Sequence, residues 1–550
     1  MLNLQTKPFN LTARQINWVN ETLAHLTDDE KIGQLFIPIG YSSDEKYLDQ
    51  LLQHHIGGLF FRSTHIDELR HTYRYAQAHS KVPLLTPANL EFGGTGAVIE
   101  GSDYAHEMAV SAAGSTKYAY TLGKISALEA KAVGINWGFA PVVDLDLNFR
   151  SPIINVRSFG DDSDRVIDNA KAYIQAFNEQ NMMTSIKHFP GDGVDERDQH
   201  LLTSINRLPF DAWWRTYGKI YRSLIDDGVR AVMIGHIALP SFAHDEVPAS
   251  LNPRLLKDLL REKLGFNGLI ITDATPMVGF ATEMPRKDAI PAAIQNGNDM
   301  ILFNHDFEED VNFMKAGLAD GRLTHERLDE AVMRILATKA SLNLNEGVTI
   351  PDGKLPDFKP EQSEVADHAI TLVRDDERIL PISPIKTKKV LLEILGAYDS
   401  NSRVEEQVKN ELEKRGFEVV VYVPETNFYD LDSVEKFKSK YDLVLYVANV
   451  ENSSNQTTAR INWHTLFGLG NNLPWFAREV PTVLVSFGNP YHQFDLPMVH
   501  TVINAYDNFP HFIQATMQKL AGESKFKGQA PTDVSCQNLK LKGLMQDENH

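Results

Sequence analysis

The sequence predicts an α/β protein: a (β/α)8 TIM-type barrel followed by a C-terminal α/β sandwich of the αβα type. Three observations support this fold class. The chain has 550 residues, too many for one ordinary hydrophobic core. Its first part alternates short apolar runs with helix-like segments, as a barrel of parallel strands requires. The alternation stops in a proline-containing linker and then starts again, which indicates a second domain.

Eight short runs rich in Val, Ile, Leu and Phe predict the barrel strands. Several are apolar at nearly every position, which is typical of parallel strands buried on both faces. The runs are Gly33–Ile39, Gly57–Phe61, Val82–Ala88, Phe139–Leu145, Thr184–Phe189, Ala231–Ile237, Gly268–Thr272 and Asp299–Phe303. Helical spacing between them is clearest in Ser115–Ala132, Asp164–Gln180 and Asn252–Lys263. Because Asn252 can cap a helix and Pro253 suits its first position, we expect the last helix to begin there.

The predicted barrel domain spans residues 1–345 and is completed by a helix over Thr324–Ala340. Residues 346–362 form the linker, and residues 363–550 form the sandwich domain. Its five predicted strands are Lys389–Leu395, Glu418–Val423, Leu443–Asn449, Thr482–Phe487 and Thr501–Ala505. With helices such as Arg403–Arg415 between them, they predict a doubly wound sheet.

Composition excludes several classes of function. The formal net charge of −19, with no Lys/Arg cluster, argues against a nucleic-acid partner. The single cysteine, Cys536, cannot form an intramolecular disulfide or a Cys-based metal cluster. His188, His200 and His236 lack the spacing of a helical metal pair, so we expect no metal, and no motif calls for a cofactor. Without a signal-like N-terminus or an apolar stretch that could span a membrane, a cytoplasmic location is expected unless a signal has been removed. The sequence predicts no oligomeric state.

Polar side chains gather at the C-terminal ends of the predicted barrel strands. In a (β/α)8 barrel this end carries the active site. Solvated loop residues would explain any one of these side chains, but the whole set favours a site. The candidate residues at these ends are Asn89, Glu91, Asp144, Lys187, His188, His236 and Asp273, with Met277 in the loop after Asp273.

The loop after the fifth strand carries an Asp-x-His pair, Asp198 and His200. A carboxylate beside a histidine can orient the ring, and such a ring can donate and then accept a proton. A solvated polar loop remains the alternative, just as Asp273 could be a helix N-cap. Arg157 and Lys187 could bind hydroxyl groups or form surface ion pairs.

Together these residues resemble glycoside hydrolase family 3, in its β-N-acetylglucosaminidase branch. Lys187–His–Phe–Pro–Gly–Asp–Gly193 resembles the family signature, and Asp198–Gln–His200 matches the Asp-x-His of that branch. Leu264–Gly–Phe–Asn–Gly–Leu–Ile–Ile–Thr–Asp273 resembles the nucleophile strand. Shorter matches are Phe139–Asp144, Arg157–Gly160 and Pro248–Leu251, and beyond the linker Ile370–Val373, Leu380–Pro381 and Lys527–Pro531.

The resemblance implies a retaining enzyme that releases terminal, non-reducing β-linked N-acetylglucosamine in cell-wall or amino-sugar turnover. It implies Asp273 as nucleophile, His200 as acid/base with Asp198 as its partner, and Lys187, His188 and Arg157 in the sugar pocket. The third-strand motif departs from the family: Asn89–Leu–Glu–Phe–Gly–Gly94 has an amide in place of a carboxylate. Three alternatives therefore stay open: a β-glucosidase or a phosphate-dependent phosphorylase on the same site, or an inactive carbohydrate-binding protein.

Overall fold

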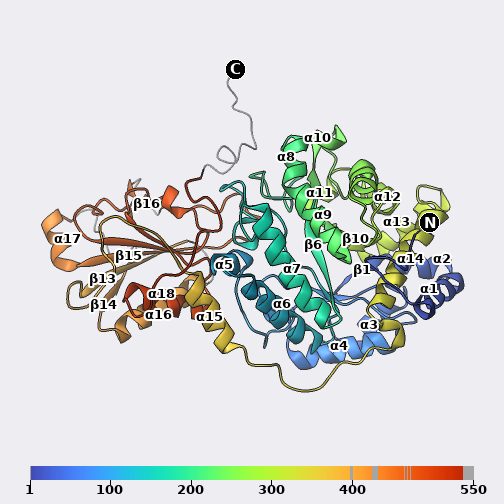
Figure 1. The fold of residues 1–550 in the computed structure, drawn as a ribbon, viewed down its shortest axis with the longest axis horizontal. Coiled ribbons are helices and arrows are strands. Elements are labelled where there is room, and N and C mark those ends of the chain that lie inside the picture. Colours follow the sequence, from blue (N-terminus) through green and yellow to red (C-terminus); the bar gives the residue numbers. More distant parts are fainter. Residues whose placement is uncertain are drawn as a thin grey trace.

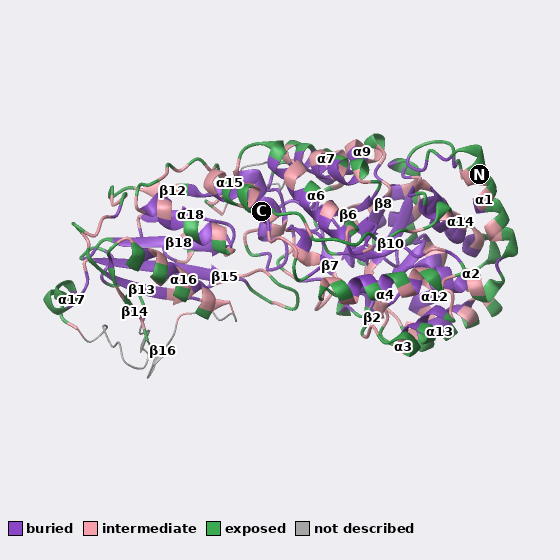
Figure 2. Ribbon diagram, turned by 90° about the horizontal axis from the view of Figure 1, so that it is seen from below, coloured by how far each residue is buried: buried purple, intermediate pink, exposed green. Residues whose placement is uncertain are grey.

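The computed structural model shows two lobes, a barrel and a sandwich (Figure 1). It describes residues 2–396, 400–423, 432–461, 463, 465–466, 469–470 and 472–536. In Figure 2 most strands of both lobes are buried, whereas many helices expose one face. This is the pattern expected of two α/β layers, each with its own core.

Parallel strands form the barrel, as the sequence predicts. They are β1 (Phe36–Ile37), β2 (Ile39–Gly40), β3 (Phe60–Phe61), β4 (Pro87–Ala88), β5 (Trp137–Gly138), β6 (Met183–Phe189), β8 (Ala231–Ile234), β10 (Leu269–Ala274) and β11 (Met300–Leu302). Seven of them share one sheet in the order β1-β11-β10-β8-β6-β5-β4. The β2–β3 pair and a bridge between Gly58 and Leu85 connect the two ends of this sheet, which curls it into a barrel.

The fourth strand differs from the prediction. The sequence places it at Phe139–Leu145, but β5 covers Trp137–Gly138, and only a single bridge from Val142 to Lys187 continues it. Pro141 lies in this stretch and has no amide hydrogen, so it cannot donate to a ladder. The structure also contains a short parallel pair that was not predicted, β7 (Ser204–Ile205) and β9 (Ile237–Ala238).

Helices surround the barrel. They are α1 (Ala13–His25), α2 (Asp28–Gln34), α3 (Glu45–Leu52), α4 (Ile66–Ala78), α5 (Glu107–Ala112), α6 (Thr116–Lys131), α7 (Ser163–Glu179), α8 (Phe210–Arg215), α9 (Tyr217–Asp227), α10 (Pro240–Ala243), α11 (Val278–Ala281), α12 (Arg286–Asn296), α13 (Phe307–Ala319) and α14 (His325–Ser341), with short turns η1 (Gly94–Gly96), η2 (Asn155–Arg157) and η4 (Leu344–Glu346). Ser115 caps α6 and Thr324 caps α14, as expected of hydroxyl side chains at these positions. The predicted helix Asn252–Lys263 is the π-helix η3 (Arg254–Lys263), and the Asn252 side chain accepts from the Arg254 N–H at 3.0 Å.

The second lobe is a six-stranded sheet in the order β12-β19-β18-β15-β13-β14. Its strands are β12 (Thr371–Asp375), β13 (Lys389–Leu395), β14 (Glu418–Val421), β15 (Leu443–Val450), β18 (Thr482–Gly488) and β19 (Thr501–Asn504). All neighbours are parallel except β12, which runs antiparallel to β19 and is not among the five predicted strands. The helices are α15 (Lys359–Ala369), α16 (Asn401–Lys414), α17 (Val434–Lys440) and α18 (Pro510–Leu520), with the turn η6 (His492–Phe494) and the β16 (Thr465–Leu466)–β17 (Leu469–Gly470) pair. The domain boundaries at residues 345 and 362 stay predictions.

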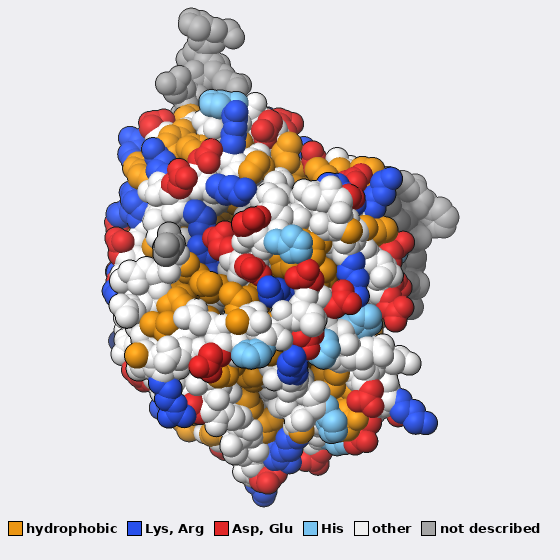
Figure 3. Space-filling model, turned by 90° about the vertical axis from the view of Figure 1, so that its right-hand side faces the viewer, with side chains coloured by type: hydrophobic (Ala, Val, Ile, Leu, Met, Phe, Trp, Pro, Cys, Tyr) orange, Lys and Arg blue, Asp and Glu red, His pale blue; other side chains and the backbone are white. Residues whose placement is uncertain are grey.

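The surface charge and the apolar content of the helices agree with the composition of the sequence. On the face seen in Figure 3, acidic and basic side chains are intermixed. Within the described ranges, no helix is both long and apolar enough to cross a membrane.

Candidate active site

The Asp-x-His pair is a closed hydrogen-bonded dyad on the loop between β6 and β7. His200 Nδ1 donates to Asp198 Oδ1 at 2.6 Å, and the His200 backbone N–H donates to the same oxygen at 2.9 Å. The Asp198 side chain is fully buried, whereas that of His200 is 24% exposed. Burial by itself would raise the pKa of Asp198, but the hydrogen bonds from His200 and its charge hold that pKa below the ordinary value. The dyad thus presents an oriented imidazole backed by a carboxylate.

Asp273 lies near the end of β10, close to a second histidine. His188 Nε2 lies 3.9 Å from Asp273 Oδ2, while His188 Nδ1 donates to Asp144 Oδ2 at 2.7 Å. The Asp273 side chain is 14% exposed. Its burial favours a raised pKa, but His188, His236, His200 and the Ala274 N–H together hold the pKa of Asp273 below its ordinary value. The carboxylate is therefore ionised and still reachable.

Glu91 joins the two predicted cations of the sugar pocket. Arg157 Nε and Nη2 donate to its two oxygens at 2.7 and 2.9 Å, and Lys187 Nζ lies 2.6 Å from Oε1. Burial alone would raise the pKa of Glu91, but the charges of Arg157 and Lys187 hold it well below the ordinary range. One carboxylate thus fixes the positions of both cationic groups.

The remaining predicted residues lie differently. The His236 ring is buried with both nitrogens engaged: Nε2 contacts the Ala274 carbonyl at 3.0 Å, and Nδ1 contacts the Ser250 hydroxyl at 2.8 Å. Burial lowers the pKa of His236, and Nε2, which faces a carbonyl oxygen, donates to it. Met277 is buried, and its N–H donates to the Ala274 carbonyl at 3.1 Å. Asn89, by contrast, is exposed.

Three residues around the dyad were not among the sequence candidates. Asp192 Oδ1 accepts from the Gly193 N–H at 2.8 Å, and the Gln199 side chain accepts from the His236 N–H at 2.7 Å. Both residues lie inside motifs that the sequence shows, Lys187–Gly193 and Asp198–His200. Their place in these motifs could have identified them as candidates. The third is Asn455 of the sandwich, whose backbone N–H donates to Asp198 Oδ2 at 2.7 Å. A backbone contact 257 residues away leaves no signal in the sequence.

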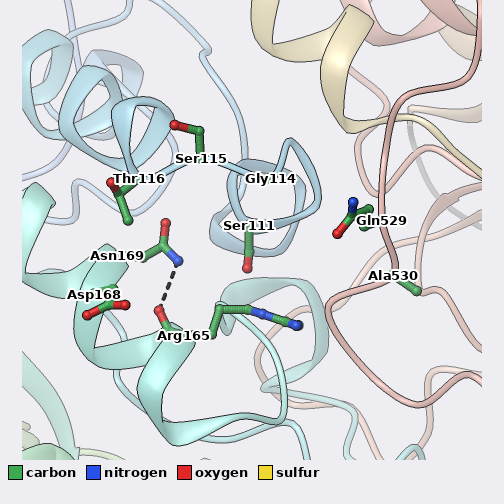
Figure 4. A pocket seen from close by; sticks show the side chains of 9 residues that line it. All are labelled: Ser111, Gly114, Ser115, Thr116, Arg165, Asp168, Asn169, Gln529 and Ala530. Carbon is green, nitrogen blue, oxygen red and sulfur yellow. Dashed lines mark hydrogen bonds between the residues drawn. The ribbon is translucent and has the colours of Figure 1, made fainter.

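Across the described part of the chain, no group of three or more His, Cys, Asp or Glu side chains is arranged to hold a metal ion. A separate pocket of about 350 Å³ opens between the barrel and the segment of Gln529 and Ala530 (Figure 4). There Gln529 and Ala530 face residues of α6 and α7. Asn169 donates to the Arg165 carbonyl at 2.9 Å, and Arg165 donates to the Pro531 carbonyl. These residues belong to the contact between the lobes, not to the set around Asp273.

The site combines an ionised, reachable carboxylate, an imidazole backed by a carboxylate, and two cationic donors held by a third carboxylate. This combination, at the C-terminal end of barrel strands, defines a carbohydrate-processing enzyme. Residues 27–338 match the model of the glycosyl hydrolase family 3 N-terminal domain. The chain belongs to glycosyl hydrolase family 3.

Relatives extend the similarity over the whole chain. The chain is 41% identical to a "Beta-N-acetylglucosaminidase/beta-glucosidase" of Cellulomonas fimi, over 98% of this chain and 99% of that protein. A beta-hexosaminidase of Methylobacillus flagellatus is 35% identical over 33% of this chain and 51% of its own length. Among solved structures, the beta-glucoside phosphorylase BglX bound to 2FGlc superposes with a TM-score of 0.91 at 41% identity, covering 97% of this chain and 99% of that one. A Paenibacillus family 3 β-N-acetylglucosaminidase shares the fold, with a TM-score of 0.78 at 24% identity over 92% and 99%.

Proposed function

We propose that this protein is a retaining β-glycosidase that acts on terminal β-linked N-acetylglucosamine or glucose, with Asp273 as nucleophile and His200 as acid/base. The observation that carries the proposal is the pairing of an ionised, reachable Asp273 with the Asp198-supported imidazole of His200. The likeness to an enzyme with both activities in its name supports both sugars.

In the first step, Asp273 attacks the anomeric carbon while protonated His200 donates its Nε2 proton to the glycosidic oxygen. The bond to the leaving group breaks, and a glycosyl ester forms on Asp273. Asp198 stabilises the imidazolium, because its Oδ1 accepts from Nδ1. Arg157 and Lys187, held by Glu91, bind sugar hydroxyls.

In the second step, the now neutral His200 takes a proton from water, and the water oxygen attacks the anomeric carbon. The ester on Asp273 breaks, which releases the sugar with its original configuration and restores the carboxylate. A histidine suits both roles because an imidazole exchanges protons near neutral pH.

Phosphate is the second candidate acceptor in this step. The observation that favours it is the acid/base itself: an imidazole repels an incoming phosphate anion less than a carboxylate in that position would. The negative charge of Asp198 is buried and is compensated by the hydrogen bonds that this carboxylate accepts. The likeness to a β-glucoside phosphorylase supports this acceptor. The product would then be a sugar 1-phosphate.

The nucleophile is tested by Asp273→Asn and by trapping. We expect Asp273→Asn to abolish release of p-nitrophenol from the aryl β-glucoside and β-N-acetylglucosaminide, a loss of at least about 10⁴-fold. A 2-deoxy-2-fluoro glucosyl substrate should leave a covalent adduct, which peptide mass spectrometry should place on Asp273. The exposed Asp320→Asn serves as control. An adduct on another carboxylate would show that the assignment is wrong.

The acid/base is tested by the leaving group. His200→Ala should lower kcat/KM on phenyl glycosides by about 10²- to 10⁴-fold and leave kcat/KM on 2,4-dinitrophenyl glycosides little changed. Only the poor leaving group of the phenyl glycosides needs a proton. Equal losses on both substrates would remove His200 from this role.

The acceptor is tested by a phosphate series on both sugars. If phosphate is the preferred acceptor, turnover rises with its concentration, and sugar 1-phosphate replaces the free sugar. Constant turnover with free sugar as sole product would instead establish hydrolysis.

A further inference from the structure

A segment of the sandwich reaches across to the candidate active site. It consists of residues 451–461, which follow β15, and we refer to it as the bridging segment. Asn452 Nδ2 donates to the Pro152 carbonyl at 2.9 Å, and the Asn455 N–H donates to Asp198 Oδ2 at 2.7 Å. The segment therefore touches two barrel loops, those of Arg157 and His200.

The contact with Asp198 completes the hydrogen bonding of a buried carboxylate. Both bonds from His200 reach Oδ1. Among the described residues, Asn455 supplies the donor to Oδ2, at the opposite side of the same carboxylate. A buried carboxylate oxygen without a donor carries a full desolvation cost. The Asn455 bond thus fixes the plane in which Oδ1 faces His200, and it helps to keep Asp198 ionised.

The bridging segment is itself held by the sandwich. The Ala459 carbonyl accepts from Asn489 Nδ2 at 2.7 Å, and Arg460 Nε donates to Asp495 Oδ1 at 2.8 Å. Asn455 has a φ of +67°, a left-handed conformation that asparagine tolerates and β-branched residues avoid. The direction of the Asn455 N–H therefore depends on a left-handed backbone conformation, in a segment that the sandwich holds in place.

We propose that Asn455 is a positioning residue through which the sandwich completes the acid/base dyad of the barrel. The proposal rests on the role of His200 given above. Its consequence is that proton donation to the leaving group requires the sandwich to be docked, whereas attack by Asp273 does not.

The test uses variants of the bridging segment in the full chain. Asn455→Pro removes the N–H and cannot adopt φ +67°; Asn455→Val keeps the N–H but disfavours that angle. Asn452→Ala removes the tie to Pro152. Ser453→Ala, an exposed neighbour, is the control. We measure kcat/KM on phenyl and 2,4-dinitrophenyl glycosides, its pH profile, and the melting temperature.

For Asn455→Pro we expect a loss of about tenfold or more on the phenyl glycoside and little change on the dinitrophenyl glycoside. The alkaline limb of its kcat/KM profile should shift, because the Asp198 carboxylate that supports the imidazolium loses a hydrogen bond. Asn455→Val and Asn452→Ala should show smaller losses of the same kind, and Ser453→Ala none.

Two outcomes overturn the proposal. One is a folded Asn455→Pro protein whose leaving-group dependence and pH profile match those of Ser453→Ala. The other is an equal loss on both substrates in Asn455→Val at an unchanged melting temperature. Either result leaves the role of His200 intact, because that role stands or falls on His200→Ala. If Asn455→Pro does not fold, Asn455→Val and Asn452→Ala decide.

Discussion

At the scale of single residues, the proposed sugar pocket depends on Glu91. This carboxylate binds Arg157 and Lys187 at once, and all three side chains are largely buried. A buried cation without its partner is costly, so Glu91 keeps two charges inside the site that could not stay there alone.

We expect Glu91→Gln to lower stability by about 3–5 kcal/mol, because it removes the charge of the carboxylate that both buried cations contact. It should also raise KM, since Arg157 and Lys187 lose their fixed positions. Thermal melting and initial-rate kinetics measure both effects. The control is Glu100→Gln on an exposed ion pair with His65, for which we expect a change of at most about 1 kcal/mol. A KM unchanged from the original protein would contradict this role.

At the scale of elements, the loop between β6 and β7 bends at two glycines. Gly191 and Gly193 have φ values of +119° and +92°, and a Cβ on Gly193 would lie 1.9 Å from the Leu145 carbonyl oxygen. Glycine permits this bend, because it adopts positive φ values at little steric cost. Gly191 packs against Tyr217 and Gly193 against Leu145, and between them the Asp192 N–H donates to Asp144 Oδ1 at 2.8 Å.

Asp192 should make the stability of this loop depend on pH. Burial, with the nearby charge of Asp144, raises the pKa of Asp192 from 3.8 to about 8. Between these values the folded state holds a proton that the unfolded chain has lost, so stability falls as pH rises through this window. Asp192→Asn has no such proton. We therefore expect the free energy of unfolding to fall less steeply from pH 5 to pH 8 in Asp192→Asn than in the original protein. The two slopes should differ by up to about 1 kcal/mol per pH unit, which melting curves at each pH measure.

The exposed Asp211→Asn is the control for this measurement and should keep the original pH dependence. Parallel melting curves for Asp192→Asn and the original protein over this range would show that Asp192 does not titrate as argued.

At the scale of the whole molecule, the lobes are joined by buried polar contacts. Tyr491 of the sandwich donates to Asp146 Oδ2 at 2.5 Å and lies 2.7 Å from the Thr532 hydroxyl. Burial raises the pKa of Asp146 to about 7, although the Tyr491 hydroxyl opposes this shift. His106 of the barrel also binds Asp507 of the sandwich, at 2.8 Å. The relative position of the lobes is thus fixed close to the barrel loops that carry the site.

We expect Tyr491→Phe to lower stability by about 1–3 kcal/mol, because it removes one donor to the buried Asp146. The loss should grow above pH 7, where more of Asp146 is ionised and the missing donor matters most. Calorimetry at pH 6 and pH 8 measures this. Tyr120→Phe, which removes a surface bond to Glu179, should cost less at both values. A loss independent of pH would argue against the ionisation of Asp146.

The two-lobed α/β architecture and the positions of most strands are predictable from the sequence, and so is the grouping of polar side chains near Asp273, because strand periodicity and contiguous motifs are local properties. Tertiary packing shows that Glu91 joins Arg157 to Lys187, that both ring nitrogens of His236 are engaged, and that Asn455 reaches Asp198. It also shortened the fourth strand and added the antiparallel β12. These features depend on groups far apart in the chain, and a backbone donor can belong to any residue except proline, so no local pattern encodes them.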